Sequence, residues 1–103
     1  MAITNSAVTN GSAANIYASS GETTVVTMYL ANYTGSSVTA NVYLVPAAGT
    51  AGVSNIIIPN VTIAAYDAYV MNTERLVLGN GDMIQANANT ASALTATVSY
   101  TDV

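Results

Sequence analysis

Residues 94–101 read Leu-Thr-Ala-Thr-Val-Ser-Tyr-Thr, an unbroken alternation of apolar and hydroxyl-rich side chains. In an extended chain, successive side chains point to opposite sides, so the apolar members would all share one face. This period of two predicts a β-strand with one face buried and one face in water. It is the clearest pattern in the chain, and it indicates an all-β fold.

Two further segments, residues 25–30 and 38–45, alternate in the same way and are rich in β-branched side chains, which strands favour. Their even-numbered positions form the predicted inner face. The inward set is Val26, Met28, Leu30, Val38, Ala40, Val42 and Leu44.

Weaker patterns predict additional strands at residues 3–9, 15–18, 56–58, 66–71, 75–78 and 83–88. Pro59 follows the run 56–58 directly. Because proline cannot donate a hydrogen bond to a neighbouring strand, we expect this strand to lie at a sheet edge or to bend there. Turns containing glycine are predicted at 19–21, 34–36 and 80–82, and a loop at 47–52.

No stretch shows a sustained helical period. Short strands at roughly ten-residue spacing predict one antiparallel β-sandwich domain of seven to eight strands over residues 1–103, with immunoglobulin-like and jelly-roll topologies both open. Residues 1–12 could act as an N-terminal arm that reaches a neighbour.

Charge is unusually scarce. Only 6% of the residues are charged, the net charge is −4 and Arg75 is the sole cation, whereas an average soluble domain has roughly 25% charged residues. A surface so poor in charge is weakly protected against self-association, which favours a homo-oligomer or larger assembly over a monomer coated with Thr and Asn. One cation excludes electrostatic binding to nucleic acid or to a membrane surface.

The sequence has no basic and apolar signal segment at its start and no apolar stretch long enough to span a bilayer. We therefore expect synthesis in the cytoplasm.

Histidine, cysteine and lysine are all missing, which removes the usual general bases, nucleophiles and soft metal ligands. We therefore expect no enzymatic activity and no cofactor. A glycosidase pair drawn from the few carboxylates is the weaker alternative. A calcium site at Asp67 and Asp82 is a second one, but no EF-hand spacing is present and a hairpin turn explains Asn80-Gly81-Asp82.

All seven aromatic residues are tyrosines, and by the alternation Tyr29 and Tyr43 point away from the core. Outward tyrosines could pack across strands, mark a protein interface or stack on a sugar ring. The candidate interface residues are Val25, Thr27, Tyr29, Thr39, Asn41, Tyr43 and Val45.

Three stretches occur in an order that resembles the small β-sandwich virion proteins of tailed bacteriophages. They are residues 15–32, residues 38–46 with their Tyr-Leu-Val-Pro ending, and the Leu-Gly-Asn-Gly-Asp-Met-Ile hairpin at 78–84 followed by the strand 94–100. This resemblance implies an accessory structural role on the virion and supplies no catalytic residues.

Our leading hypothesis is a capsid decoration (cement) protein that binds other virion proteins and its own copies. A tail, collar or fibre component is the close alternative. The rival from another class is a carbohydrate-binding module that recognises host surface polysaccharide.

Overall fold

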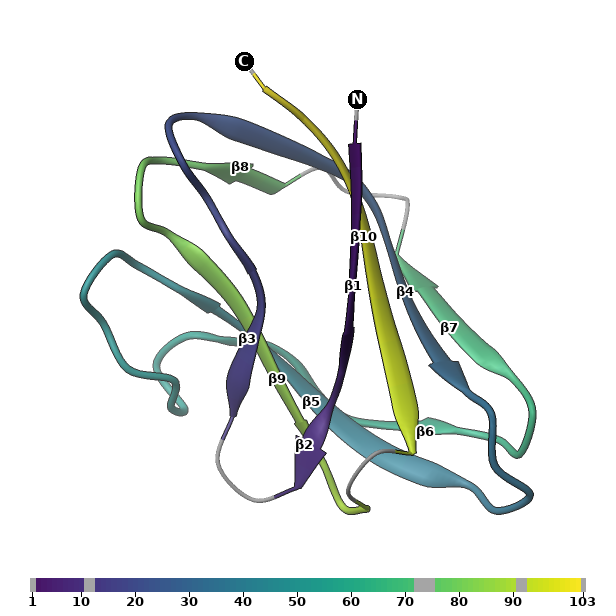
Figure 1. The fold of residues 1–103 in the computed structure, drawn as a ribbon. Coiled ribbons are helices and arrows are strands. Elements are labelled where there is room, and N and C mark those ends of the chain that lie inside the picture. The colour runs from purple at the N-terminus through teal and green to yellow at the C-terminus, as the bar shows by residue number, and fades with distance from the viewer. Residues whose placement is uncertain (1, 11–12, 72–75, 91–92, 103) are drawn as a thin grey trace.

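A computed structural model describes residues 2–10, 13–71, 76–90 and 93–102, which form ten strands in two facing sheets (Figure 1). The strands are β1 (Ala2–Ala7), β2 (Thr9–Asn10), β3 (Ala14–Ala18), β4 (Thr23–Asn32), β5 (Val38–Val45), β6 (Ile56–Ile63), β7 (Ala68–Met71), β8 (Leu76–Leu78), β9 (Met83–Ala88) and β10 (Leu94–Asp102). The predicted all-β class and two-layer arrangement are confirmed, but the predicted number of strands is too low.

The two sheets are built alike. Sheet A has the order β1-β10-β4, with β7 and β8 one after the other along the far edge of β4. Sheet B has the order β9-β5-β6, with β2 and β3 one after the other along the far edge of β9. Ten strands therefore occupy eight positions, four in each sheet. The pairing of β2 with β9 is parallel, and the other pairings between described strands are antiparallel.

The predicted strand 3–9 is divided at Val8, where the chain leaves sheet A and enters sheet B. Val8 is buried, and its backbone N–H donates to the Leu94 carbonyl at 3.0 Å. The described residues 2–10 thus pair within this chain's own sheets. A further reach of residues 1–12 to a neighbour stays a prediction.

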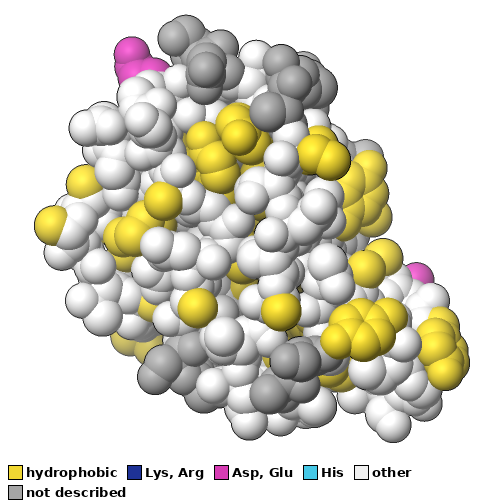
Figure 2. Space-filling model, in the orientation of Figure 1, with side chains coloured by type: hydrophobic (Ala, Val, Ile, Leu, Met, Phe, Trp, Pro, Cys, Tyr) yellow, Lys and Arg dark blue, Asp and Glu magenta, His cyan; other side chains and the backbone are white. Residues whose placement is uncertain are grey.

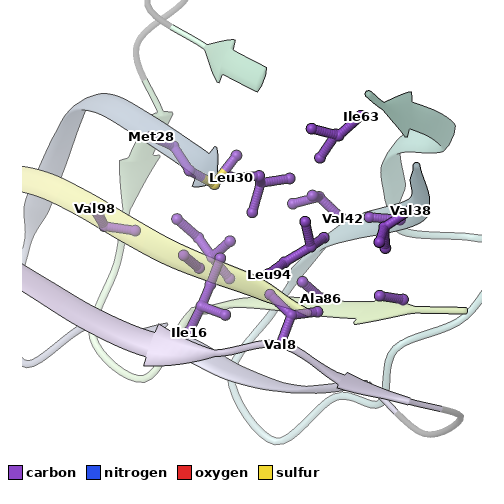
Figure 3. Packing of buried hydrophobic residues seen from close by; sticks show 14 of the residues in the cluster. Val8, Ile16, Met28, Leu30, Val38, Val42, Ile63, Ala86, Leu94 and Val98 are labelled. Atoms are coloured by element: carbon purple, nitrogen blue, oxygen red, sulfur yellow. The ribbon is translucent and has the colours of Figure 1, made fainter. Parts of the chain in front are cut away.

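The core lies between the sheets, where side chains from both layers meet (Figure 3). The predicted inward residues Met28, Leu30, Val38, Ala40, Val42, Leu94, Ala96 and Val98 are all buried. Leu44 and Tyr100 are half-buried and pack against this cluster. Each fully buried large aliphatic side chain contributes about 1.5–3 kcal/mol relative to exposure. The alternating segments share this stabilisation with Val8, Ile16, Ile63, Leu78 and Ile84 from the other strands.

A β-bulge in β4 ends the predicted alternation. Ser99 pairs with Thr27, but the next residue, Tyr100, pairs with Val25, so β4 has one extra residue at this point. An extra residue exchanges the two faces of a strand, which is why Thr23 is buried although it is odd-numbered like the outward Tyr29. The side chains of residues 24–26 are not among those described.

Strand β6 is an edge strand, as Pro59 predicted, and its register against β5 shifts twice. Asn60, directly after the proline, has a φ of 50°, and its N–H donates to the Asn41 side-chain oxygen at 2.8 Å. The strand nevertheless continues past Pro59 to Ile63.

Candidate functional site

The predicted interface residues lie on two opposite sides of the molecule. Thr27 and Tyr29 are on the outer face of sheet A, whereas Thr39, Asn41 and Tyr43 are on the outer face of sheet B. The structure therefore does not bring them together as one patch.

Val45 is fully buried, so the expectation that it points outward is wrong. With Leu78 and Asp82 it lines a hollow of about 220 Å³ between the end of β5 and the β8–β9 turn. Alternation along one strand does not reveal that a distant turn folds over the strand's end. For Val25, whose backbone pairs with Tyr100 and Leu76, the side chain lies outside the described part of the chain.

Three rows of paired residues on the outer face of sheet A contain no charged side chain among the residues that the structure describes. Its central row runs across four strands through directly paired residues, Asn5, Thr97, Tyr29 and Val70. Two flanking rows complete what we call the neutral face. These rows consist of Ile3, Ser99 and Thr27 on one side and Ala7, Thr95, Ala31 and Ala68 on the other.

Several apolar members of the neutral face are open to solvent: Ile3 is 66%, Tyr29 43% and Val70 42% exposed. The hydroxyl of Thr97 donates to the Asn5 side-chain oxygen at 2.8 Å, which links β10 to β1 across this face. Removing water from methyl groups and neutral hydroxyls costs far less than removing it from ions. The neutral face can therefore be covered by another protein surface at low cost.

The outer face of sheet B has a different chemistry, because its amide side chains bind one another. Gln85 donates to Asn15 at 2.7 Å, and Asn41 donates to Asn87 at 3.0 Å while its own oxygen accepts from the Asn60 backbone. These groups are already hydrogen-bonded within the sheet. They are less available to a ligand than the open groups of the neutral face.

One end of the sandwich is organised by Asn32, a buried polar residue that the sequence analysis did not single out. Its Nδ2 donates to the backbone carbonyls of Ser36, Ile63 and Ala64, and its Oδ1 accepts from the N–H and hydroxyl of Thr34. The side chain is 2% exposed. It fastens the β4–β5 loop to the β6–β7 loop.

These two loops present the most exposed tyrosines, Tyr33 at 57% and Tyr66 at 77%. Tyr66 has a φ of 57°, which is rare for a bulky residue, and its N–H donates to the Thr34 carbonyl. A Cβ on Gly35 would lie 3.4 Å from the Tyr66 hydroxyl, so the ring packs over this glycine. We call Tyr33 and Tyr66 the aromatic corner. Hydrophobic atoms gather at the lower right of Figure 2, where Figure 1 places both loops.

Sequence reasoning missed the aromatic corner because it weighed only tyrosines within alternating strands. A signal was present, since Tyr33 adjoins the predicted turn 34–36. A tyrosine in a turn has no inner sheet face to occupy.

The two carboxylates considered for calcium lie at opposite ends of β4. The Asp67 carbonyl accepts from Asn32 at the end of β4, whereas the Asp82 carbonyl accepts from Ser19, just before β4 begins. They therefore cannot share a cation. Within the described ranges, no group of three or more His, Cys, Asp or Glu side chains could hold a metal ion.

Asp82 confirms the predicted hairpin turn. Gly81 has a φ of 86°, and the two carboxylate oxygens of Asp82 accept from the backbone N–H groups of Ala47 at 2.9 Å and Gly79 at 2.8 Å. The carboxylate thus closes a turn and ties it to the β5–β6 loop. Glu74 and Arg75, read as a surface pair, lie outside the described residues.

Comparison with protein-family models, with curated proteins and with solved structures finds no match to this chain. Among the residues that the structure describes, no helix is long and apolar enough to cross a lipid bilayer.

Proposed function

We propose that the chain is a non-enzymatic structural protein of a tailed-bacteriophage virion, which decorates the capsid by docking onto neighbouring subunits. The neutral face carries the docking part of this proposal, because it is broad, partly apolar and free of charged members. The resemblance of residues 15–32, 38–46, 78–84 and 94–100 to small virion proteins supports its place on a particle. A tail, collar or fibre position would use the same face.

The strand pairing supports a jelly roll as the finer description of the fold. We count β2 with β3, and β7 with β8, as one position each along the chain. The first position (β1) then pairs with the eighth (β10), the second (β2 and β3) with the seventh (β9), the third (β4) with the sixth (β7 and β8) and the fourth (β5) with the fifth (β6). This nested pairing is that of a long hairpin rolled into two sheets, an architecture common in viral capsid and lectin domains. An immunoglobulin-like sandwich divides its strands differently, with seven strands in sheets ABED and CFG.

Binding to particles that lack the chain tests the docking proposal. Purified chain should co-sediment with such particles, and Tyr29→Asp should abolish the binding, because it places an ion in the middle of the neutral face. Val70→Asp, in the same row of paired residues, is a second variant in case the first does not fold. Circular dichroism would establish that each variant is folded.

Tyr66→Asp is the matched control, because it makes the same substitution at an exposed tyrosine outside the neutral face. It should co-sediment like the wild type. Loss of binding in Tyr66→Asp with full binding in Tyr29→Asp would move the docking site to the aromatic corner. Failure of the wild-type chain to bind particles would overturn the proposed function.

Carbohydrate binding is the second candidate, and the aromatic corner is the observation that favours it. Tyr66 has a positive φ, which is strained for a bulky residue, and its side chain is 77% exposed. Exposed tyrosine rings stack on sugars. Host polysaccharide should then bind the wild type and Tyr29→Ala equally, and bind Tyr66→Ala and Tyr33→Ala at least tenfold more weakly. A glycan array without a hit would remove this candidate.

A further inference from the structure

The outer edge of β1 differs from the other sheet edges of the molecule. An edge strand presents unpaired backbone N–H and C=O groups, and most proteins protect such edges with proline, bulges, charge or very short strands. Among the described strands, the edges of the two sheets are formed by β1, by β7 with β8, by β2 with β3, and by β6.

Three of these edges carry protection. Strand β6 contains Pro59, the positive-φ Asn60 and two register shifts. Strands β7 and β8 have only four and three residues. Strand β2 has two residues in a parallel pairing, and β3 shifts register between Asn15 and Tyr17.

Strand β1 has none of these features. Its six residues, Ala-Ile-Thr-Asn-Ser-Ala, contain no charge, proline or glycine. They pair with β10 in six consecutive antiparallel steps without a register shift. Among the strands that the structure describes, only β10 pairs with β1, so the other edge of β1 has no strand partner there.

We propose that β1 pairs antiparallel with β1 of a second copy across a two-fold axis, so that the two A sheets become one continuous sheet. Identical strands are self-complementary in this arrangement, as an isologous interface requires. The two neutral faces would join side by side, and no ion would be desolvated or repelled across the axis. Ile3, 66% exposed in one copy, would be covered at the junction. This inference deepens the proposed function and rests on it, because it names a second copy as one partner.

Two aliphatic-to-lysine variants test the pairing. The wild-type chain should sediment as a dimer, and Ile3→Lys should raise the dimer dissociation constant at least tenfold, because it places a cation from each copy on the paired β1 strands. Val53→Lys is the matched control, since Val53 is 95% exposed in the β5–β6 loop. It should dimerise like the wild type.

A cysteine scan locates the axis, and the chain contains no cysteine to interfere. A two-fold pairing that keeps both neutral faces on one side must place one residue of β1 opposite its own copy. Directly opposed residues in antiparallel strands are about 4.5–5.5 Å apart at Cα, which is within disulfide range. Single cysteines at positions 3–7 should therefore include one that oxidises efficiently to a covalent dimer, whereas Thr62→Cys on edge strand β6 should stay monomeric.

A wild-type chain that remains monomeric, or a dimer in which no position of β1 cross-links, would overturn the edge pairing. Neither result would contradict docking onto particles if the same chain still binds them. Failure of the edge pairing can therefore be distinguished from failure of the docking proposal.

Discussion

Asn32 holds together the β4–β5 and β6–β7 loops, which carry the aromatic corner. Replacing it by alanine would leave the carbonyls of Ser36, Ile63 and Ala64 and the N–H of Thr34 without this partner. A buried polar group left unsatisfied costs about 1–3 kcal/mol. We expect Asn32→Ala to lower the free energy of unfolding by about 3 kcal/mol, measured by urea denaturation.

Asn10 provides the control, because it is exposed at the end of β2. Asn10→Ala should change the free energy of unfolding by less than about 0.5 kcal/mol. Equal effects of the two substitutions would show that the hydrogen bonds of Asn32 do not organise this end.

Asp82 acts through both carboxylate oxygens on the backbone. Asp82→Asn would point an amide NH₂ at one of the two N–H groups that the carboxylate now binds, at Ala47 or Gly79. We expect a loss of about 1–3 kcal/mol in stability, seen as a lower thermal midpoint. Asp67→Asn should be nearly neutral, since an asparagine retains the oxygen that accepts from Ala68. Unchanged stability in Asp82→Asn would contradict the structural role of this carboxylate.

At the scale of elements, the sequence predicts strands well where the alternation is unbroken. The even-numbered residues of the ranges 94–98, 38–42 and 28–30 face inward as expected, because a period of two has only one consistent solution once one face is buried. The same reasoning stops at the β4 bulge and at Val8, because both depend on pairing with β10. Register between strands distant in sequence is not visible in either strand alone.

Substitutions at Asn60 test whether strand β6 requires a positive φ at the residue after Pro59. Its φ of 50° is strained for most residues and free of strain for glycine. We expect Asn60→Ala to destabilise the protein by about 1 kcal/mol and Asn60→Gly to be neutral or stabilising. Chemical denaturation of both variants measures this difference, and equal stabilities would show that β6 does not hold Asn60 at positive φ.

The sequence indicated which kinds of side chain the candidate site would contain. It did not show which strands bring these side chains together. Scarcity of charge predicted outer surfaces with few ions, because composition limits what any surface can contain. The assignment of Tyr29 to one sheet and Tyr43 to the other could not be predicted, because it depends on which distant strands pair with β4 and β5. The neutral face also includes Asn5 and Val70, which belong to strands far from β4 in the sequence.

At the scale of the whole molecule, the outer faces of sheets A and B differ in their chemistry. The amide side chains of sheet B bind one another, whereas the neutral face of sheet A leaves Ile3, Tyr29 and Val70 open to solvent. On the side that Figure 2 shows, acidic atoms are visible only near the periphery. A molecule of this kind is suited to being covered on one side by other subunits.

Electron cryo-microscopy of intact particles containing this chain tests that claim most directly. With density for the chain assigned, the account predicts that the neutral face of sheet A is covered by a neighbouring subunit. A chain whose neutral face looks into solvent around the whole particle, with its contacts made elsewhere, would contradict it.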